Sequence, residues 1–417
     1  MGFVAAMFVI LMAFILSSFI MFSFFHVRFF TLEMTFLSMA LALGFVSMTV
    51  YMLGICHLLY GVVILMVALG ATAVSLLLAP HAWVTLWRDI SSSSTQWVRN
   101  FLAHPIIGGL TLIFSLFIIS EGILALYPPT AWDGIMYHLP LAEFYVHSHS
   151  LSYSPFIRYS FAPQANEMLY SLVLALGGTG VAAQLIEFVI MLLTSVGTYL
   201  IGLRYFSSRW TGILAAGLFL ALQVTIDEGT SAYVDLWFVM YGLAALLSAR
   251  RFLSGPVRAG TGRWAVLTGI FNGLSMDGKY SGMLVLFSLI VCLILFRVKI
   301  RKFIFLITIS CLAISSPWYI RNLILTGDPA YPMLTNIFGN RGPWTQEQIT
   351  YQISSFSSRG PISSVLLHNA ILIWNQFIQE DGVSSYVPYI ISLSLLQNHE
   401  PLCGKGFSST KKDFTPT

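Results

Sequence analysis

Residues 181–203 read VAAQLIEFVIMLLTSVGTYLIGL, and the basic segment RYFSSR follows at 204–209. A bilayer core of roughly 30 Å is crossed by about 20 consecutive apolar residues, so this stretch has the length of one membrane-spanning helix. Lys and Arg concentrate in short cytoplasmic loops, and the segment behind the helix therefore marks its cytoplasmic end. An apolar run closed by basic residues is the pattern from which the fold of the whole chain is predicted.

The composition of the chain agrees with a lipid environment. Of the 417 residues, 57% are hydrophobic and 9% are charged, and the mean hydropathy is +0.80. Soluble domains carry about 25% charged residues. Apolar runs of spanning length recur from Met1 to about Ile320, and the first, Phe3 to Phe25, lacks the basic leader and cleavage site of a signal peptide. We predict an all-α polytopic membrane protein with about ten membrane-spanning helices and almost no soluble domain.

Three basic loops predict the topology. They are Arg204 to Arg209, Arg250 to Arg263 and Arg297 to Lys302, and we place all three in the cytoplasm. Helices between two loops on the same side must come in pairs, so the turn inside each pair faces outward. The predicted pairs are 213–225 with 234–248, and 264–276 with 280–296.

The same rule places the remaining segments. The long segment 128–180 and the polar stretch 321–360 fall outside, whereas His26, Arg28, Arg88 and Arg99 fall inside. The other predicted helices are 3–25, 29–50, 57–79, 106–126 and 303–320, with weaker apolar runs at 362–377 and 384–396. The polar residues 397–417 are either a simple tail or the mark of a truncated or frame-shifted product.

Polar residues between positions 130 and 330 gather at one predicted membrane face. Charged side chains in or beside membrane spans cost about 2.5–3.5 kcal/mol to insert and are therefore functional candidates by default. Spans that start far apart in the sequence would together line one cavity there, as expected of an active site at an interface. The residues concerned are Asp133, Asp227, Glu228, Asp235, Asp277, Lys279, Arg321, Asn322 and Asp328.

The first outer loop is rich in aromatic residues and short amphipathic pieces, which are typical of a segment on the membrane surface. Asp133 stands at its start, and Tyr137 and His138 follow one helical turn later. A helix there would bring carboxylate, phenol and imidazole together, and the carboxylate would suit a general base. Alternatively, Asp133 only caps the helix by accepting from free N–H groups.

Other polar residues also have two interpretations. Glu143 and Glu167 would position a sugar hydroxyl or would be solvated loop charges. Lys279 would neutralise a phosphate or pair with Asp277, and Arg321 with Asn322 would be interfacial anchors.

Metal ligation finds little support in the sequence. His147 and His149 lack a carboxylate or cysteine partner at ligand spacing, so we interpret them as exposed loop histidines. The four cysteines show no CxxC or Cys/His spacing. Glu121 and Glu187 lie inside predicted spans, where pairing with other helices is the favoured interpretation. We identify no cofactor, and involvement of a divalent metal stays open.

Five sequence blocks follow one another along the chain: WDGIMYHLP (132–140), FAPQANEMLY (161–170), SAYVDLWFVMY (231–241), GLSMDGKYSG (273–282) and SSPWYIRNLILTGDPAYP (315–332). In this order they resemble the GT-C superfamily of membrane glycosyltransferases. The likeness is to the bacterial branch similar to protein O-mannosyltransferases and to enzymes that add sugars to lipopolysaccharide, and it covers roughly residues 106–335.

The resemblance implies transfer of a sugar from a polyprenyl-phosphate carrier to an acceptor hydroxyl at the extracytoplasmic face. Asp133 would be the catalytic base, and Lys279 would hold the carrier phosphate, whose developing charge it offsets. Asp235 would help to bind donor or acceptor, and Arg321 would assist. The remaining residues expected to bind substrate are Tyr137, His138, Glu167 and Tyr280.

The predicted domains follow from this resemblance. Residues 1–105 hold additional N-terminal helices and a cytoplasmic loop, 106–335 the GT-C-like catalytic core, 336–396 an outer loop with weak helices, and 397–417 the polar tail. We expect a multi-pass protein of the bacterial inner (plasma) membrane. Its expected partners are a polyprenyl-phosphate-linked sugar, a lipid, glycan or protein acceptor, and membrane lipid, but no nucleic acid.

Two other functions compete with transfer. A secondary transporter also contains intramembrane acids, but it predicts polar residues near the bilayer midplane and an internal repeat, and no clear repeat is seen. A non-catalytic protein of envelope assembly is the third possibility.

Overall fold

The computed structural model describes residues 2–25, 31–78, 105–154, 156–157, 159–253, 261–295 and 301–356, which form helices and turns without a strand. The predicted runs 362–377 and 384–396, the tail 397–417, the loop residues His26, Arg28, Arg88 and Arg99, and parts of two basic loops lie outside these ranges.

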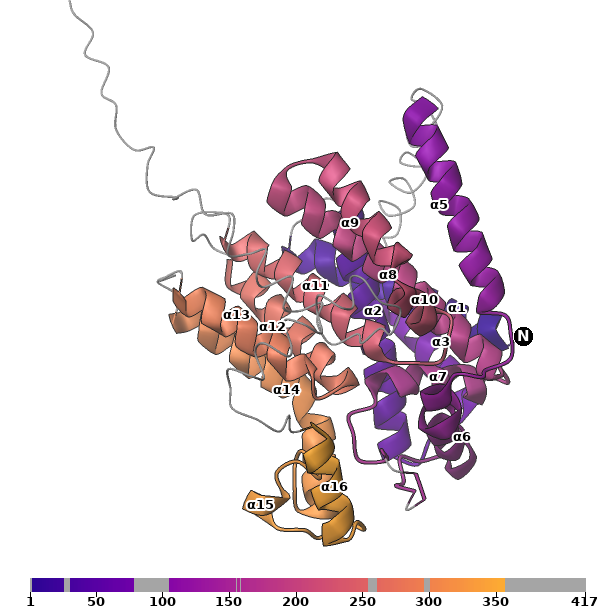
Figure 1. Ribbon diagram of the computed structural model, residues 1–417, viewed down its shortest axis with the longest axis vertical. Coiled ribbons are helices and arrows are strands. Elements are labelled where there is room, and N and C mark those ends of the chain that lie inside the picture. The colour runs from indigo at the N-terminus through magenta and orange to yellow at the C-terminus, as the bar shows by residue number, and fades with distance from the viewer. Residues whose placement is uncertain are drawn as a thin grey trace, which may run out of the picture.

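Each span predicted between residues 3 and 320 coincides with a helix, except 213–225, which is divided between two helices, and the helices pack into one bundle (Figure 1). Hydrocarbon offers no hydrogen bonds to the backbone, so apolar segments of this length adopt the helical form. The helices are α1 (Gly2–Phe25), α2 (Leu32–Ile55), α3 (Gly61–Leu78), α5 (Pro105–Leu124), α8 (Gly180–Phe206), α9 (Arg209–Ala221), α11 (Asp235–Leu253), α12 (Thr261–Gly278), α13 (Gly282–Leu295) and α14 (Arg301–Thr326).

Not every helix has the length and hydropathy of a full span. Within the described ranges five pass alone: Gly2–Met21, Leu32–Ile55, Gly180–Phe206, Asp235–Leu253 and Lys302–Thr326. Helices α9 and α10 (Gln223–Gly229) pass only together, and they are bent by 70° at Leu222, inside the span predicted at 213–225. The chain is thus a multi-pass membrane protein with five or six candidate spans in its described part, and the larger total of about ten remains a prediction.

Helix α12 is less apolar than its neighbours because it is enclosed by protein. Gly269 and Gly273 form a GxxxG pair, in which small residues let helices approach closely. A Cβ on Gly269 would lie 2.3 Å from the carbonyl oxygen of Ile307 in α14, and one on Gly273 would lie 2.7 Å from that of Cys311. The buried hydroxyl of Ser275 donates to the Phe238 carbonyl in α11, at 3.1 Å. Helix α12 is therefore held between α11 and α14.

One end of the bundle carries a three-way ion pair. Glu33, at the start of α2, is only 2% exposed and binds Arg204 of α8 at 2.7 Å and Arg251 of α11 at 2.6 Å. Two of the three predicted basic loops therefore meet at this end, where α2 begins and α8 and α11 finish. The opposite end holds the start of α11 and the finish of α12.

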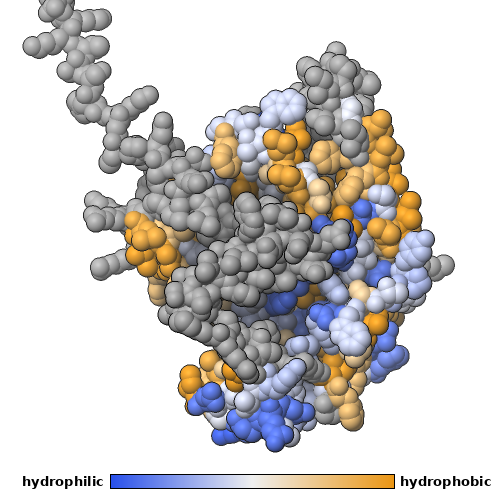
Figure 2. Space-filling view, in the orientation of Figure 1, coloured by the Kyte–Doolittle hydropathy of each residue, from blue (hydrophilic) through white to orange (hydrophobic). Residues whose placement is uncertain are grey.

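That opposite end carries the short helices of the predicted loop 128–180. They are η1 (Gly134–His138, a π-helix), α6 (Leu139–Ser148) and α7 (Ala165–Ala175). Helix α7 differs from the expectation of a surface segment, because residues 165–173 are all buried and α7 contacts α2, α6 and α8. Two further helices, α15 (Thr335–Phe338) and α16 (Gln346–Phe356), stand at the lower end of the molecule, where hydrophilic side chains gather in Figure 2, while α5 is largely hydrophobic.

The turn after α12 is packed against α11 through Gly278. A Cβ there would lie 2.2 Å from Cδ1 of Trp237, which is fully buried and whose indole N–H donates to the Leu274 carbonyl at 2.7 Å. Gly278 thus lets Lys279, the next residue, approach the start of α11.

We predict that Glu33→Ala destabilises the protein, since Arg204 and Arg251 would lose their shared acceptor. Hydrogen bonds to charged groups contribute about 1.5–3 kcal/mol, and the value here should fall at the lower end because both arginines are about a third exposed to solvent. Thermal unfolding in detergent should show a lowered Tm. Glu347→Ala, on exposed α16, serves as the control, and equal Tm values for both variants would contradict the prediction.

Gly278→Ala should also lower the Tm, because Trp237 is enclosed and cannot move away from the added methyl group. Overpacking of this kind costs about 1–3 kcal/mol. The control is Gly70→Ala in α3, where an added Cβ meets open space. An unchanged Tm of the Gly278 variant would contradict this prediction, because it would show that Trp237 can move away.

Candidate active site

Asp133 stands directly before the π-helix η1 and leaves its carboxylate uncommitted to the helix backbone. Its own backbone is helical, at φ −64° and ψ −37°, and its side chain makes no capping hydrogen bond. The capping interpretation is therefore wrong for this geometry. π-Helical turns are rare and often occur at functional sites, and here the turn lies beside a half-buried carboxylate.

Tyr137 and His138 accompany Asp133, as predicted. Burial, together with a hydrogen bond from its hydroxyl to the Asp133 carboxylate, raises the pKa of Tyr137. The Tyr137 and His138 rings lie 4.2 Å apart between centroids. A π-helical turn, where an α-helical turn was expected, thus brings Tyr137 to Asp133 and His138 to Tyr137.

His138 forms a buried pair with Glu167. The imidazole Nδ1 lies 2.8 Å from Oε1 of Glu167 in α7, and the two residues are 5% and 3% exposed. The second carboxylate oxygen of Glu167 is buried and makes no hydrogen bond. Glu167 is therefore no solvated loop charge, whereas Glu143 is exposed.

Lys279 pairs with Asp235, the first residue of α11. Its ammonium nitrogen lies 2.6 Å from Oδ1 of Asp235. Burial would lower the pKa of Lys279, but attraction to Asp235, with smaller contributions from Glu228 and Asp133, raises it. The alternative pairing with Asp277 is wrong, because Asp277 is fully buried and neither of its carboxylate oxygens has a partner.

The turn 230–234 joins the Asp133 side of the site to the Asp235 side. A Cβ on Gly134 would lie 3.4 Å from the Ala232 carbonyl oxygen, so η1 rests on this turn. Burial, together with the negative charge of Asp133, raises the pKa of Tyr233, so the Tyr233 phenol lies within electrostatic range of the Asp133 carboxylate. Asp133, Asp235 and Lys279 consequently belong to one site, formed by chain segments about a hundred residues apart.

Tyr280 and Arg321 form a separate, more buried group. The Tyr280 hydroxyl lies 3.2 Å from the Tyr331 carbonyl and accepts from Asn322, and Arg321 is 5% exposed. The Arg321 guanidinium donates to the carbonyls of Ser160 and Leu151, each at 3.2 Å. It thus secures the loop before α7, and binding of substrate by either residue stays a prediction.

Two buried carboxylates of this end had no assigned role in the site: the sequence indicated only pairing with another helix for Glu187 and a place at the polar membrane face for Glu228. Glu228 in α10 and Glu187 in α8 are 7% and 0% exposed, and each has one oxygen without a hydrogen bond. Glu228 acts electrostatically on Lys279 and Tyr233. The position of Glu187 inside an apolar sequence was the available signal, because a buried acid in such a setting needs partners. Within the described ranges no group of three His, Cys, Asp or Glu residues has the geometry of a metal site.

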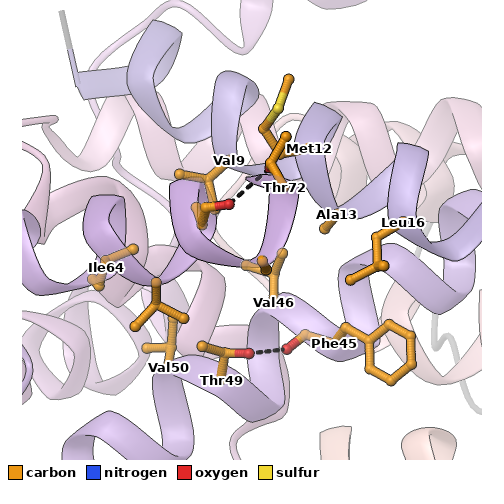
Figure 3. A pocket seen from close by; sticks show the side chains of 13 residues that line it. Val9, Met12, Ala13, Leu16, Phe45, Val46, Thr49, Val50, Ile64 and Thr72 are labelled. Carbon is orange, nitrogen blue, oxygen red and sulfur yellow. Dashed lines mark hydrogen bonds between the residues drawn. The ribbon is translucent and has the colours of Figure 1, made fainter. Parts of the chain in front are cut away.

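A cavity between α1, α2 and α3 lies apart from these charges (Figure 3). It is lined by apolar side chains such as Val9, Val46 and Ile64, and its Thr49 hydroxyl already donates to the Phe45 carbonyl at 2.7 Å. It offers no charged group for a sugar or a phosphate, so the candidate active site is the charged cluster and not this cavity.

Comparison with known proteins points to the part of the chain that holds most of this charged cluster. Residues 163–320, which include Glu167, Asp235 and Lys279, match the family model described as dolichyl-phosphate-mannose-protein mannosyltransferase. An uncharacterized protein of Shigella flexneri is 29% identical over 132 residues, and the match covers 32% of this chain and 64% of that protein. No solved structure matches. Residues 163–320, which are less than half of the chain, therefore match a family of glycosyltransferases that is described as dolichyl-phosphate-mannose-protein mannosyltransferase.

Proposed function

We propose that this protein transfers a sugar from a polyprenyl-phosphate carrier to an acceptor hydroxyl at the extracytoplasmic face of the bacterial inner membrane. The observation that carries the proposal is the meeting of Asp133, uncapped and half-buried, with the Asp235–Lys279 pair at one end of the bundle. A base and a cation placed together near an interface suit a donor whose phosphate rests at that interface. The family of residues 163–320 supports the reaction class.

Asp133 is the general base of the proposed reaction. The acceptor oxygen attacks the anomeric carbon as Asp133 takes the hydroxyl proton, and the bond from the anomeric carbon to the phosphate oxygen breaks. The bonding electrons leave with the polyprenyl phosphate, and the configuration at the anomeric carbon inverts. Tyr137, which donates to Asp133, fixes the carboxylate while leaving its other lone pairs for the acceptor.

Lys279 is the cation that receives the donor phosphate. Charge grows on the phosphate as it leaves, and a fixed positive charge stabilises that change. Asp235 holds the ammonium in place at 2.6 Å until the donor arrives. The buried His138–Glu167 pair, which borders Tyr137, supplies polar atoms for sugar hydroxyls through the unpaired oxygen of Glu167.

The proposed side of the membrane follows from charge. Arg204 and Arg251 gather at the Glu33 end, which the positive-inside rule assigns to the cytoplasm. The site lies at the other end and would face the periplasm or cell exterior. Lipid, glycan and protein remain the acceptor classes.

Asp133→Asn should abolish transfer, because the amide keeps the shape of the side chain but cannot accept the proton. The free energy of unfolding should stay within about 0.5 kcal/mol of the wild-type value. The assay follows label from a panel of radiolabelled polyprenyl-phosphate sugars into lipid, glycan or protein, using membranes that contain the full chain. Glu143→Gln, an exposed site on nearby α6, is the matched control and should transfer normally. A folded wild-type chain without transfer from any donor would refute the proposed function.

Lys279→Ala should mainly weaken use of the donor. Loss of the cation removes charge stabilisation of the phosphate, and we expect kcat/KM for the donor to fall by about 10²–10³-fold, as for removal of other electrostatic stabilisers. Lys279→Arg, which keeps the charge, should restore part of the activity. Equal activity of the alanine variant and wild type at limiting donor would exclude this role.

A further inference from the structure

We infer that Glu187 is a positioning residue that holds the turn 230–234, and through it both halves of the active site, by accepting hydrogen bonds. This inference rests on the proposed function for its kinetic consequences. Its structural part stands on the contacts of Glu187 alone and is testable without transfer.

Glu187, in α8, is fully buried. Its Oε2 accepts from Nδ2 of Asn166 at 2.8 Å and lies 3.1 Å from the Tyr170 hydroxyl, and both of these residues belong to α7. A buried carboxylate in an apolar helix is costly unless it is hydrogen-bonded. Glu187 thus has a defined structural task, which is to orient the polar face of α7.

Both α7 residues also bind the Tyr233 carbonyl. Nδ2 of Asn166 lies 3.0 Å from that oxygen, and the Tyr170 hydroxyl makes a short hydrogen bond to it. Asn166 has two amide protons and Tyr170 has one hydroxyl proton. One Asn166 proton goes to Glu187 and the other to Tyr233, so the carboxylate sets the rotation of the amide that holds the turn.

Tyr233 transmits this position in two directions. Its phenol lies within electrostatic range of the Asp133 carboxylate, and its ring lies 6.4 Å from that of His138. Two residues farther along the chain, Asp235 begins α11 and meets Lys279. A shift of the Tyr233 backbone would therefore alter the separation of base and cation, and displacements of about 1 Å can cost about 10²-fold in rate.

To hold the turn, residue 187 needs a hydrogen-bond acceptor at the position of Oε2 but does not need a negative charge. The other oxygen, Oε1, has no hydrogen bond, so Glu187→Gln can place its carbonyl at Oε2 and its amide nitrogen at the unpartnered position. Glu187→Leu keeps a similar volume but removes the acceptor. The two variants therefore separate hydrogen bonding from charge.

Hydrogen–deuterium exchange of the full chain in detergent tests the structural part. Glu187→Leu should speed exchange in peptides spanning 230–236 by at least about tenfold, and Glu187→Gln should match wild type. Gln184→Leu is the matched control, because Gln184 is equally buried on α8 but donates to the carbonyls of Ala125 and Tyr127. It should lower the Tm without local opening at 230–236.

Kinetics test the functional part. With the labelled donor, Glu187→Leu should lower kcat by about 10- to 100-fold, whereas kcat of Glu187→Gln should stay within about twofold of the wild-type value. Gln184→Leu should lose activity only in proportion to its loss of folded protein. Unchanged exchange at 230–236 in Glu187→Leu, or loss of activity in Glu187→Gln equal to that of the leucine variant, would overturn the inference. Local opening in a protein whose wild type transfers nothing would retain the positioning of the turn and reject only the proposed function.

Discussion

The fold depends on one constraint, which is that hydrocarbon satisfies neither backbone hydrogen bonds nor charges. The apolar segments therefore form helices, and the ion pairs named here lie at the two ends of the bundle. Glu33 binds two arginines at one end, and Asp235 binds Lys279 at the other. The separation of these pairs by the length of α11 allows one end to act as an anchor while the other serves as the candidate site.

The helices could be predicted from the sequence because length and hydropathy are local properties. Tertiary packing accounts for the differences. Helix α12 is less apolar in sequence than its neighbours but is enclosed by α11 and α14 through Gly269 and Gly273, and hydropathy does not reveal which elements cover a helix. The bend at Leu222 and the burial of α7 likewise depend on neighbours that are distant in the chain.

The candidate site was predictable in its residue types and less so in its pairings. Asp133, Tyr137 and His138 lie together because their spacing is short. Lys279 pairs with Asp235, 44 residues away, although Asp277 is nearer in sequence. Side chains two positions apart at the end of a helix point in different directions, so Asp277 is buried in the core while Lys279 reaches α11. Arg321 was expected to assist Lys279, which stays a prediction; its guanidinium donates to backbone carbonyls of a loop whose path no local pattern reveals.

The Asp235–Lys279 pair reconciles a stable resting site with donor binding. The Lys279 side chain is 45% exposed, and ion pairs with this much solvent contribute about 0–1 kcal/mol. The phosphodiester of the donor carries one negative charge, as a carboxylate does, and it gains a second charge as the bond to the anomeric carbon breaks, so it competes for the ammonium at small cost. In the proposed reaction Asp235 would then remain beside an occupied lysine and would accept hydrogen bonds from sugar hydroxyls. An enclosed ion pair would resist this exchange, and the partial exposure of Lys279 is therefore a condition for its proposed task.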